Sequence, residues 1–516
     1  MPRHRDVPSL ESLSLEAVGG FVVALTPPIL ATIDVYSQPQ AALQSSIDWL
    51  KELLVSHIPL YLFDSMAVQV LNAVKELIEQ TKKSYFPYVN MSTFMTKMNV
   101  VVGLTEVVLN KYLKQINFSL WPKIMRYVLY KNMYQLEGLE VLNLGSCIGG
   151  WRSSEYDKFI KDGISQMKNL RSLCLCFDCT DSILQILGEN CPHLQCLDVT
   201  SSRSVTDRSI PHLLKCQQLR ELQLNRTSIS IEGFAHLLLG LEKLQDIGRC
   251  DELGSIIQYL DDNYAHCESL GLRKIHTRDV NTQSLRLLVN LCPKIEQISL
   301  FHDERFTDLT ALSTLYNLRD LKLLSCDFYS YYLNSLLEIR GANLTSLHLE
   351  HVEDIDLNAL IFVSQHCPRL KNLVLYNCDV IDKMTVHNRY LKVKPFQCLE
   401  RIFWVVDCAF SHLEFILLHS FNIKYIHLGS STGILHESLA NVMAVNPMRE
   451  LEELRILYSN DLSMTTVRML LDSCPKLRVL SELEGWQGVS VEELEDFKKY
   501  VASHNLDLNI KPILSY

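Results

Sequence analysis

Apolar residues recur along most of the chain in one short pattern. In the stretch from Cys367, a Cys-Pro pair precedes leucines at positions 370, 373 and 375. Three more Cys-Pro pairs begin equivalent stretches at Cys191, Cys292 and Cys474, and nine weaker copies lack the pair. Counting a degenerate copy near Leu270, successive copies begin 23 to 31 residues apart. The thirteen clearer copies begin at Leu139, Leu170, Leu194, Leu219, Leu244, Ile295, Leu318, Leu344, Leu370, Leu399, Ile423, Leu451 and Leu477.

Each copy predicts a short strand followed by a helix that returns the chain. Alternate side chains of a strand face opposite sides, so Leu373 and Leu375 should point to one core. Another copy continues into residues 181–190, whose apolar residues fall on one face of a helix. One such unit cannot bury its own apolar face, so neighbouring units must stack and share a core.

The spacing Leu-x-x-Leu-x-Leu at this period is that of a leucine-rich repeat. The cysteines make it similar to the cysteine-containing class of such repeats, which is common in substrate receptors of ubiquitin ligases. We therefore predict an α/β solenoid, a leucine-rich-repeat horseshoe preceded by a small all-α domain. The expected parts are a helical adaptor-binding and N-capping region at 1–135, repeats at 136–485 and a C-terminal cap at 486–516. A solenoid is a recognition surface that many proteins use, so the fold alone only suggests a function.

A helix is predicted to begin at Ser9, a favourable N-cap, after a loose tail over residues 1–7. Its i, i+3, i+4, i+7 and i+8 positions form a largely apolar stripe of Leu10, Leu13, Ser14, Ala17 and Val18. The stripe resembles a BC box, the helix by which substrate receptors dock on elongin C. That family has a small residue, Leu, three residues, Cys, three residues and an aliphatic residue, and this chain departs from the pattern at Ser14.

The resemblance to a BC box implies that Leu10 enters a pocket of elongin C and that Val18 makes the last contact. The implied adaptor-binding residues of this helix are Ser9, Leu10, Leu13, Ser14 and Val18. The alternative is an ordinary amphipathic helix that packs on its own domain.

A second motif begins at Ile58-Pro59, forty positions after Val18. It resembles the cullin box that follows a BC box in cullin-2 receptors: an aliphatic residue, Pro, two residues, an aliphatic residue, three residues and another aliphatic residue. The resemblance implies that Ile58 and Pro59 meet cullin-2 and that Leu62 begins the packing side of the next helix. The forty-residue separation is longer than in compact receptors. Alternatively, Pro59 simply starts a core helix, because Pro is favoured in a first helical turn.

The two boxes in this order resemble the PRAME-like and zyg-type families of leucine-rich-repeat receptors. They imply a non-catalytic substrate receptor that binds elongin B/C, cullin-2 and a protein substrate. An F-box receptor using a Skp-type adaptor and cullin-1 is an alternative, although no Leu-Pro pair opens near residue 8. The rival from another class is a repeat scaffold with no ligase role.

The net charge, the apolar segments and the cysteine content indicate which partners and which cellular compartment to expect. The net charge of −10 argues against nucleic-acid binding, which usually needs a basic face. Residues 18–33 are apolar but contain two glycines and two prolines, so we expect a buried loop or helix end there and no membrane span. Many of the 16 cysteines occupy repeat positions, and no signal-peptide core directly follows the N-terminus. These features favour reduced thiols in the cytoplasm or nucleus.

No motif predicts a catalytic, metal or cofactor site. Cys174, Cys176 and Cys179 lie near Cys191 and His193, but their spacing is not that of a zinc finger. The glycines between 429 and 433 follow a repeat strand and predict a turn rather than a phosphate loop. The histidines are scattered outside any recognisable nucleophile or base motif.

Residues between the strand leucines should face away from the core and form a concave surface. Its C-terminal half is richer in aromatic residues and histidine, which are favoured as interface anchors. Each could alternatively be no more than an exposed strand residue. The predicted substrate-binding residues are His348, Tyr376, Phe403, Tyr425 and His427.

Overall fold

The computed structural model describes residues 3–35, 39–83, 91–145, 154–264, 269–278, 280–301, 307–329, 333–381, 396–407 and 410–512. The chain divides into two compact units. One comprises Pro8–Arg249, and the other comprises Cys250–Tyr516 together with Met1–Val7. The division falls inside the repeats, and each unit is described by itself.

The first unit begins with helices that precede the repeats. They are α1 (Leu10–Ala24), α2 (Thr26–Val35), α3 (Pro39–His57), α4 (Phe63–Lys83), α5 (Met91–Gly103) and α6 (Lys123–Lys131). The 3-10 turns η1 (Leu60–Leu62), η2 (Leu104–Val108) and η4 (Met133–Gln135) connect some of them. Strand β1 (Gln115–Asn117) pairs in parallel with the first repeat strand, β2 (Val141–Gly145), so that the repeats do not begin with an open edge.

The apolar segment over residues 18–33 contains the end of α1 at Ala24, as one of the two expectations had it, and then continues as α2 instead of forming a loop. Leu25 alone separates α1 from α2, and Pro27 and Pro28 fall in the first turn of α2, where a missing backbone N–H costs nothing. By length and composition, Leu10–Ile33 could cross a membrane. A buried core helix meets the same criterion. The pair α3 and α4 meets it only as two halves bent by 116°.

Two other local expectations also changed. The polar composition of residues 35–45 predicts a loop, but α3 already begins at Pro39, and residues 36–38 lie outside the described part of the chain. Residues 3–7 were expected to be a loose tail, but His4 pairs antiparallel with Leu506 and the backbone N–H of Arg5 donates to the carbonyl of Asn505 at 2.8 Å. Sequence patterns do not report a pairing between segments about 500 residues apart.

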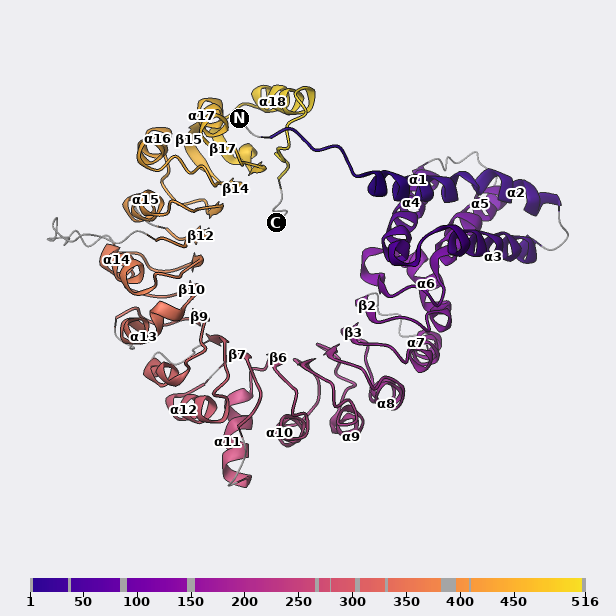
Figure 1. The fold of residues 1–516 in the computed structure, drawn as a ribbon, viewed down its shortest axis with the longest axis horizontal. Coiled ribbons are helices and arrows are strands. Elements are labelled where there is room, and N and C mark those ends of the chain that lie inside the picture. Colours follow the sequence, from indigo (N-terminus) through magenta and orange to yellow (C-terminus); the bar gives the residue numbers. More distant parts are fainter. Residues whose placement is uncertain are drawn as a thin grey trace. The chain divides into compact units, whose positions relative to one another are not determined.

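The repeats of the first unit alternate strands and helices, and Figure 1 shows the helices on one side of the strands. All strand pairs are parallel, in chain order. The elements are β2, α7 (Ser154–Gln166), β3 (Ser172–Leu175), α8 (Asp181–Asn190), β4 (Cys196–Asp198), α9 (Ile210–Leu213), β5 (Glu221–Gln223), α10 (Ile231–Gly240) and β6 (Asp246–Arg249).

The second unit continues the same alternation (Figure 1). Its strands are β7 (Lys274–Arg278), β8 (Gln297–Phe301), β9 (Asp320–Leu324), β10 (Ser346–Glu350), β11 (Asn372–Tyr376), β12 (Arg401–Val405), β13 (Tyr425–Leu428), β14 (Glu453–Ile456) and β16 (Val479–Ser481). Its helices are α11 (Leu253–Asn263), α12 (Thr282–Leu291), α13 (Leu333–Arg340), α14 (Leu357–His366), α15 (Phe410–His419), α16 (His436–Val445), α17 (Met464–Ser473) and α18 (Val491–Ser503). A short pair, β15 (Ser459–Ser463) and β17 (Trp486–Gly488), lies near the C-terminal end.

The Cys-Pro pairs mark the ends of repeat helices. Cys191, Cys367 and Cys474 are the C-cap residues of α8, α14 and α17, and each backbone N–H bonds to the carbonyl four residues earlier. The following proline cannot continue the helix. All three thiols are buried, and burial raises the pKa of each to about 12. These cysteines therefore act as small core residues. Ser490 and Glu493 form a capping box at the start of α18, as the spacing Ser-x-x-Glu predicts.

Candidate functional site

Helix α1 packs on α4 through one face only. The Ser9 hydroxyl accepts a hydrogen bond from the Ser12 backbone N–H at 3.0 Å, which confirms the predicted N-cap. Leu15, Gly19 and Val22 form the buried face. A Cβ at Gly19 would lie 2.9 Å from the backbone oxygen of Gln69 in α4, so only glycine permits this close approach.

The opposite face of α1 is apolar and exposed. Leu10 is 81% exposed, Leu13 is 44% exposed and Phe21 is 45% exposed. Ser14 and Ala17 are also exposed, and Val18 is half-buried at the edge of this face. We call Leu10, Leu13, Ala17 and Phe21 the outer stripe. The residues of the predicted BC box thus do not provide the core face of α1, which lies on the other side of the helix.

The cullin-box segment lies between α3 and α4 and forms a projecting turn. Pro59 is the N-cap of η1, where Leu60 is exposed and Tyr61 is 82% exposed. Ile58 and Leu62 are half-buried. Helix α4 begins only at Phe63, after this turn rather than at Pro59. The main exposed apolar residues of this turn are therefore Leu60 and Tyr61, which occupy the two positions that the cullin-box pattern leaves unspecified.

Phe63 and Asp64 fix this turn to the rest of its unit. Phe63 is fully buried, and the Asp64 carboxylate accepts a hydrogen bond from the backbone N–H of Lys114 at 2.8 Å. Lys114 directly precedes β1, which pairs with the first repeat strand. The exposed turn consequently projects from a rigid base.

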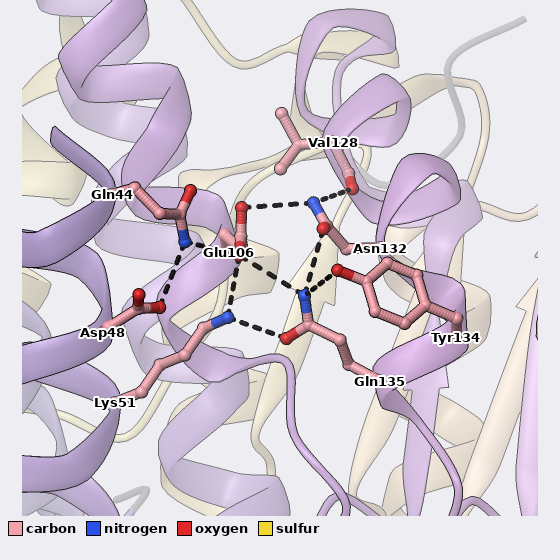
Figure 2. A network of polar contacts seen from close by, with 8 residues as sticks. All are labelled: Gln44, Asp48, Lys51, Glu106, Val128, Asn132, Tyr134 and Gln135. Atoms are coloured by element: carbon pink, nitrogen blue, oxygen red, sulfur yellow. Dashed lines mark hydrogen bonds and ion pairs between the residues drawn. The ribbon is translucent and has the colours of Figure 1, made fainter. Parts of the chain in front are cut away.

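A polar network ties α3 to the segments that lead into the repeats (Figure 2). Glu106 of η2 accepts hydrogen bonds from Lys51 at 2.8 Å, Gln44 at 3.3 Å, Asn132 at 3.2 Å and Gln135 at 3.4 Å. Burial acts to raise the pKa of Glu106, but the hydrogen bond and charge of Lys51 and the hydrogen bonds of Gln44 and Gln135 outweigh it and hold the pKa below its usual range. The ionised network joins three elements and holds α3 in one orientation.

Three of the predicted substrate-binding residues, His348, Phe403 and His427, lie in one row across the strands of the second unit. Strand register aligns His348 with Val374, Val374 with Phe403, and Phe403 with His427. The same row continues to Arg455 on β14. All of these side chains are half-buried, whereas the leucine, isoleucine and tryptophan residues before and after them on each strand are buried. The assignment of faces made from sequence is therefore confirmed.

Three of the five predicted substrate-binding residues are joined by ring contacts of Phe403 with Tyr376 and with His427. The ring centroids of Phe403 and His427 are 4.4 Å apart, and those of Tyr376 and Phe403 are 6.3 Å apart. We call Tyr376, Phe403 and His427 the aromatic cluster. The other two predicted residues, Tyr425 and His348, lie on the same face of the strands beside this cluster. Tyr425 lies under Arg401 in an adjacent row, and Val374 separates His348 from Phe403.

Burial favours the neutral form of both histidines of this row. Burial, aided by the charge of Lys322, lowers the pKa of His348 to about 4. Burial and the charge of Arg455 also lower the pKa of His427. The aromatic cluster consequently offers an uncharged, largely apolar surface.

The sequence predicts no metal site. The cysteines considered for one, however, lie in different surroundings. Cys191 lies in the core, where its thiol contacts the carbonyl of Met167 at 3.4 Å. Cys174 and Cys176, in contrast, come together with the Asp198 carboxylate on the strand side of the first unit. Among the described residues this is the one group of three metal-ligating side chains.

Comparison with known proteins gives partial similarities. No family model matches the chain. F-box protein SKIP1 of Arabidopsis thaliana is 27% identical over 164 residues, covering 28% of this chain and 55% of that protein. F-box/LRR-repeat protein 4 of Bos taurus is 26% identical over 152 residues, covering 28% of this chain and 24% of that protein. The chain thus spans about half the length of the first relative and a quarter of the second.

Among solved structures, a chain from the yeast Rad7 and Elc1 complex is similar at a TM-score of 0.36 and 14% identity. The similarity covers 81% of this chain and 95% of that chain. The strands and helices described above define a leucine-rich-repeat protein with an N-terminal group of helices. Its two sequence relatives named above are both F-box proteins.

Proposed function

We propose that this protein is the substrate-recognition subunit of a cullin-2 ubiquitin ligase, docked through elongin B/C and working in the cytoplasm or nucleus. The outer stripe of α1 carries the proposal. Its apolar side chains face solvent on a helix whose other face is already packed on α4. A rigid helix with a few exposed apolar anchors at i, i+3, i+7 and i+11 suits insertion into the groove of a partner.

The projecting turn supports the second contact of this proposal. Pro59, Leu60 and Tyr61 are exposed beside one another, and their base is fixed by Phe63 and Asp64. Exposed apolar residues that form one patch can provide an interaction site for a partner protein. In the proposed complex this turn contacts cullin-2 while α1 contacts elongin C.

The proposed mechanism is proximity. The adaptor and cullin fix one end of the receptor, and the concave face holds a protein substrate, so ubiquitin transfer to a substrate lysine becomes effectively intramolecular. The receptor supplies no catalytic group in this scheme. The aromatic cluster provides the apolar anchor for the substrate, because aromatic side chains commonly dominate the binding energy of an interface.

A second candidate is an F-box-type receptor of a Skp and cullin-1 ligase. The observation that favours it is the name of both sequence relatives, which are F-box proteins. In that case the same N-terminal helices contact a Skp-type adaptor. A repeat scaffold without a ligase role is the remaining alternative.

Affinity purification of the full chain followed by mass spectrometry distinguishes these functions. Recovery of elongin B, elongin C and cullin-2 is the expected result. Recovery of a Skp-type adaptor with cullin-1 instead supports the F-box candidate, and recovery of no cullin under gentle conditions supports the scaffold. Because Leu10–Ile33 also meets the length and composition of a membrane span, the cell extract is first fractionated. Retention of the chain in membranes after a carbonate wash contradicts the proposal.

Changing Ile58 and Pro59 together to alanine is expected to weaken cullin-2 association about tenfold, a loss of about 1.4 kcal/mol. Elongin C binding should persist, because the outer stripe is untouched. Pro59 is exposed and Ile58 is half-buried, so the melting temperature should change little. Co-precipitation of both partners measures the effect. Glu52→Ala, on the exposed side of α3, is the control, and equal cullin-2 recovery from both variants contradicts the assignment.

Phe403→Ala is expected to weaken substrate capture by about 2 kcal/mol, roughly 30-fold, while the protein stays folded. Phe403 contacts both other members of the aromatic cluster, yet it is only half-buried on the strand surface. Substrates recovered with the wild-type chain provide the binding assay. Phe421→Ala removes an exposed phenylalanine outside the strands and serves as the matched control. Undiminished capture by Phe403→Ala would place the substrate site elsewhere.

A further inference from the structure

Two cysteine thiols and one carboxylate converge on the strand side of the first unit. Cys174 lies in β3, and Cys176 follows two residues later, so both side chains leave the same face. Strand register places Asp198 of β4 directly beside Cys174. The two sulfur atoms are 3.7 Å apart, and the Cys174 sulfur is 3.8 Å from Oδ2 of Asp198. All three ligand atoms lie within 4.8 Å of one another.

These separations fit one tetrahedral metal ion. With metal–sulfur bonds of about 2.3 Å and metal–oxygen bonds of about 2.0 Å, a tetrahedral ion separates two sulfur ligands by about 3.8 Å and a sulfur from an oxygen by about 3.5 Å. The sulfur atoms are thus already at the required distance, and the carboxylate needs only a small movement. By contrast, a disulfide would need the sulfur atoms to approach to about 2.05 Å.

The carboxylate is also oriented toward the thiols by its neighbours. Oδ1 of Asp198 accepts hydrogen bonds from the Thr200 backbone N–H at 3.0 Å and from its hydroxyl at 2.6 Å. This leaves Oδ2 facing Cys174. Hydrogen bonds to the second oxygen of a ligating carboxylate are the usual way in which proteins orient such ligands.

The pair of thiols is particular to this repeat. Positions equivalent to Cys174 and Cys176 hold Asp198 and Thr200 in the next repeat, and Gln223 and Asn225 in the one after it. Of these three equivalent pairs of positions, only the pair at 174 and 176 therefore consists of cysteines. Cys174, Cys176 and Asp198 are each half-buried, so an ion can reach them from solvent.

We propose that Cys174, Cys176 and Asp198 bind one thiophilic divalent cation of the zinc class, with water in the fourth position. Each thiol gives its proton to solvent as its sulfur bonds to the ion. Two thiolates favour such a cation over magnesium or calcium, which prefer oxygen ligands. The open fourth position faces the strand side of the unit. The proposal is independent of the ligase role, because none of its residues belongs to the outer stripe, the projecting turn or the aromatic cluster.

Metal titration of the full-length chain tests the proposal. The chain is purified in reductant, stripped with a chelator and titrated with Cd²⁺ while ultraviolet absorbance reports thiolate-to-metal charge transfer. One equivalent should bind with this absorbance, and the Cys174→Ser, Cys176→Ser double variant should lose it. Asp198→Asn should weaken binding about tenfold. Cys196→Ser removes a half-buried thiol of β4 outside the group and should behave as wild type.

A second measurement does not depend on the variants folding. Zn²⁺ should slow alkylation of Cys174 and Cys176 in the wild-type chain at least about tenfold and leave Cys196 unchanged, as read by peptide mass spectrometry. Equal alkylation with and without Zn²⁺ overturns the proposal. So does one equivalent of Cd²⁺ bound by the double serine variant as tightly as by wild type.

Discussion

Replacing Leu10 by serine is expected to remove about 2–3 kcal/mol of elongin C binding, a loss of roughly 30- to 150-fold, without unfolding the protein. Leu10 is 81% exposed at the start of α1, so its side chain contributes almost nothing to the core of its own unit. In the proposed complex it becomes buried in a pocket, and transfer of a leucine side chain from water is worth about that much. Binding of purified elongin B/C measured by calorimetry, with the melting temperature of each variant, tests this directly.

Two further variants of α1 serve as controls for that experiment. Glu16→Ser changes an exposed residue of α1 outside the outer stripe and should leave elongin C binding as in wild type. Ser14→Cys restores the residue usual in a BC box, so binding should be equal or tighter. Unchanged affinity of Leu10→Ser contradicts the BC-box assignment, because neither Leu13 nor Phe21 is as exposed as Leu10.

The repeats could be predicted from the sequence because each copy carries its own evidence. Leu373 and Leu375 are buried and Val374 between them is half-buried, as a strand with one core face requires. The pattern repeats so often that one strand fixes the faces of its neighbours. The row through Phe403 and His427 was predictable for the same reason.

The features that sequence reasoning missed depend on neighbours from distant segments. Phe21 continues the outer stripe one turn beyond the BC-box pattern, and its position eleven residues after Leu10 was the available signal. Asp198 joins Cys174 only because stacking sets their strands side by side. In the same way, nothing in residues 3–7 indicates that they pair with the C-terminal segment.

Pro27 and Pro28 do not turn the apolar segment into a loop, and the reason is local. Pro27 and Pro28 predict a break in the apolar segment, since proline in a helix interior removes a hydrogen bond and clashes with the preceding turn. Both fall in the first turn of α2, where neither penalty applies. Whether the prolines disrupt a helix depends on the exact residue at which α1 ends and α2 begins. That residue is Leu25, and leucine is not a residue that signals the end of a helix.

Leu375→Ala is expected to destabilise its part of the repeats by about 2–5 kcal/mol. Leu375 is fully buried on β11, and strand register places it between Leu349 and Trp404, which are also buried. Alanine leaves a cavity that neighbours on both sides cannot close, because each is held by its own repeat. Hydrogen exchange of the β10–β12 amides reports the local loss, which a single melting temperature of a repeat protein can average out.

The matched control is Val374→Ala, one position earlier on the same strand. Val374 is half-buried between His348 and Phe403 on the concave face, so its truncation leaves a shallow surface depression rather than a cavity. We expect a loss of less than about 1 kcal/mol from Val374→Ala, since only a partly exposed side chain is shortened. Both variants introduce alanine into the same strand at adjacent positions. The difference between their losses of stability therefore reports mainly the effect of burial. Equal exchange rates in the two variants would contradict the assignment of Leu375 to the core and of Val374 to the opposite, partly exposed face of the strand.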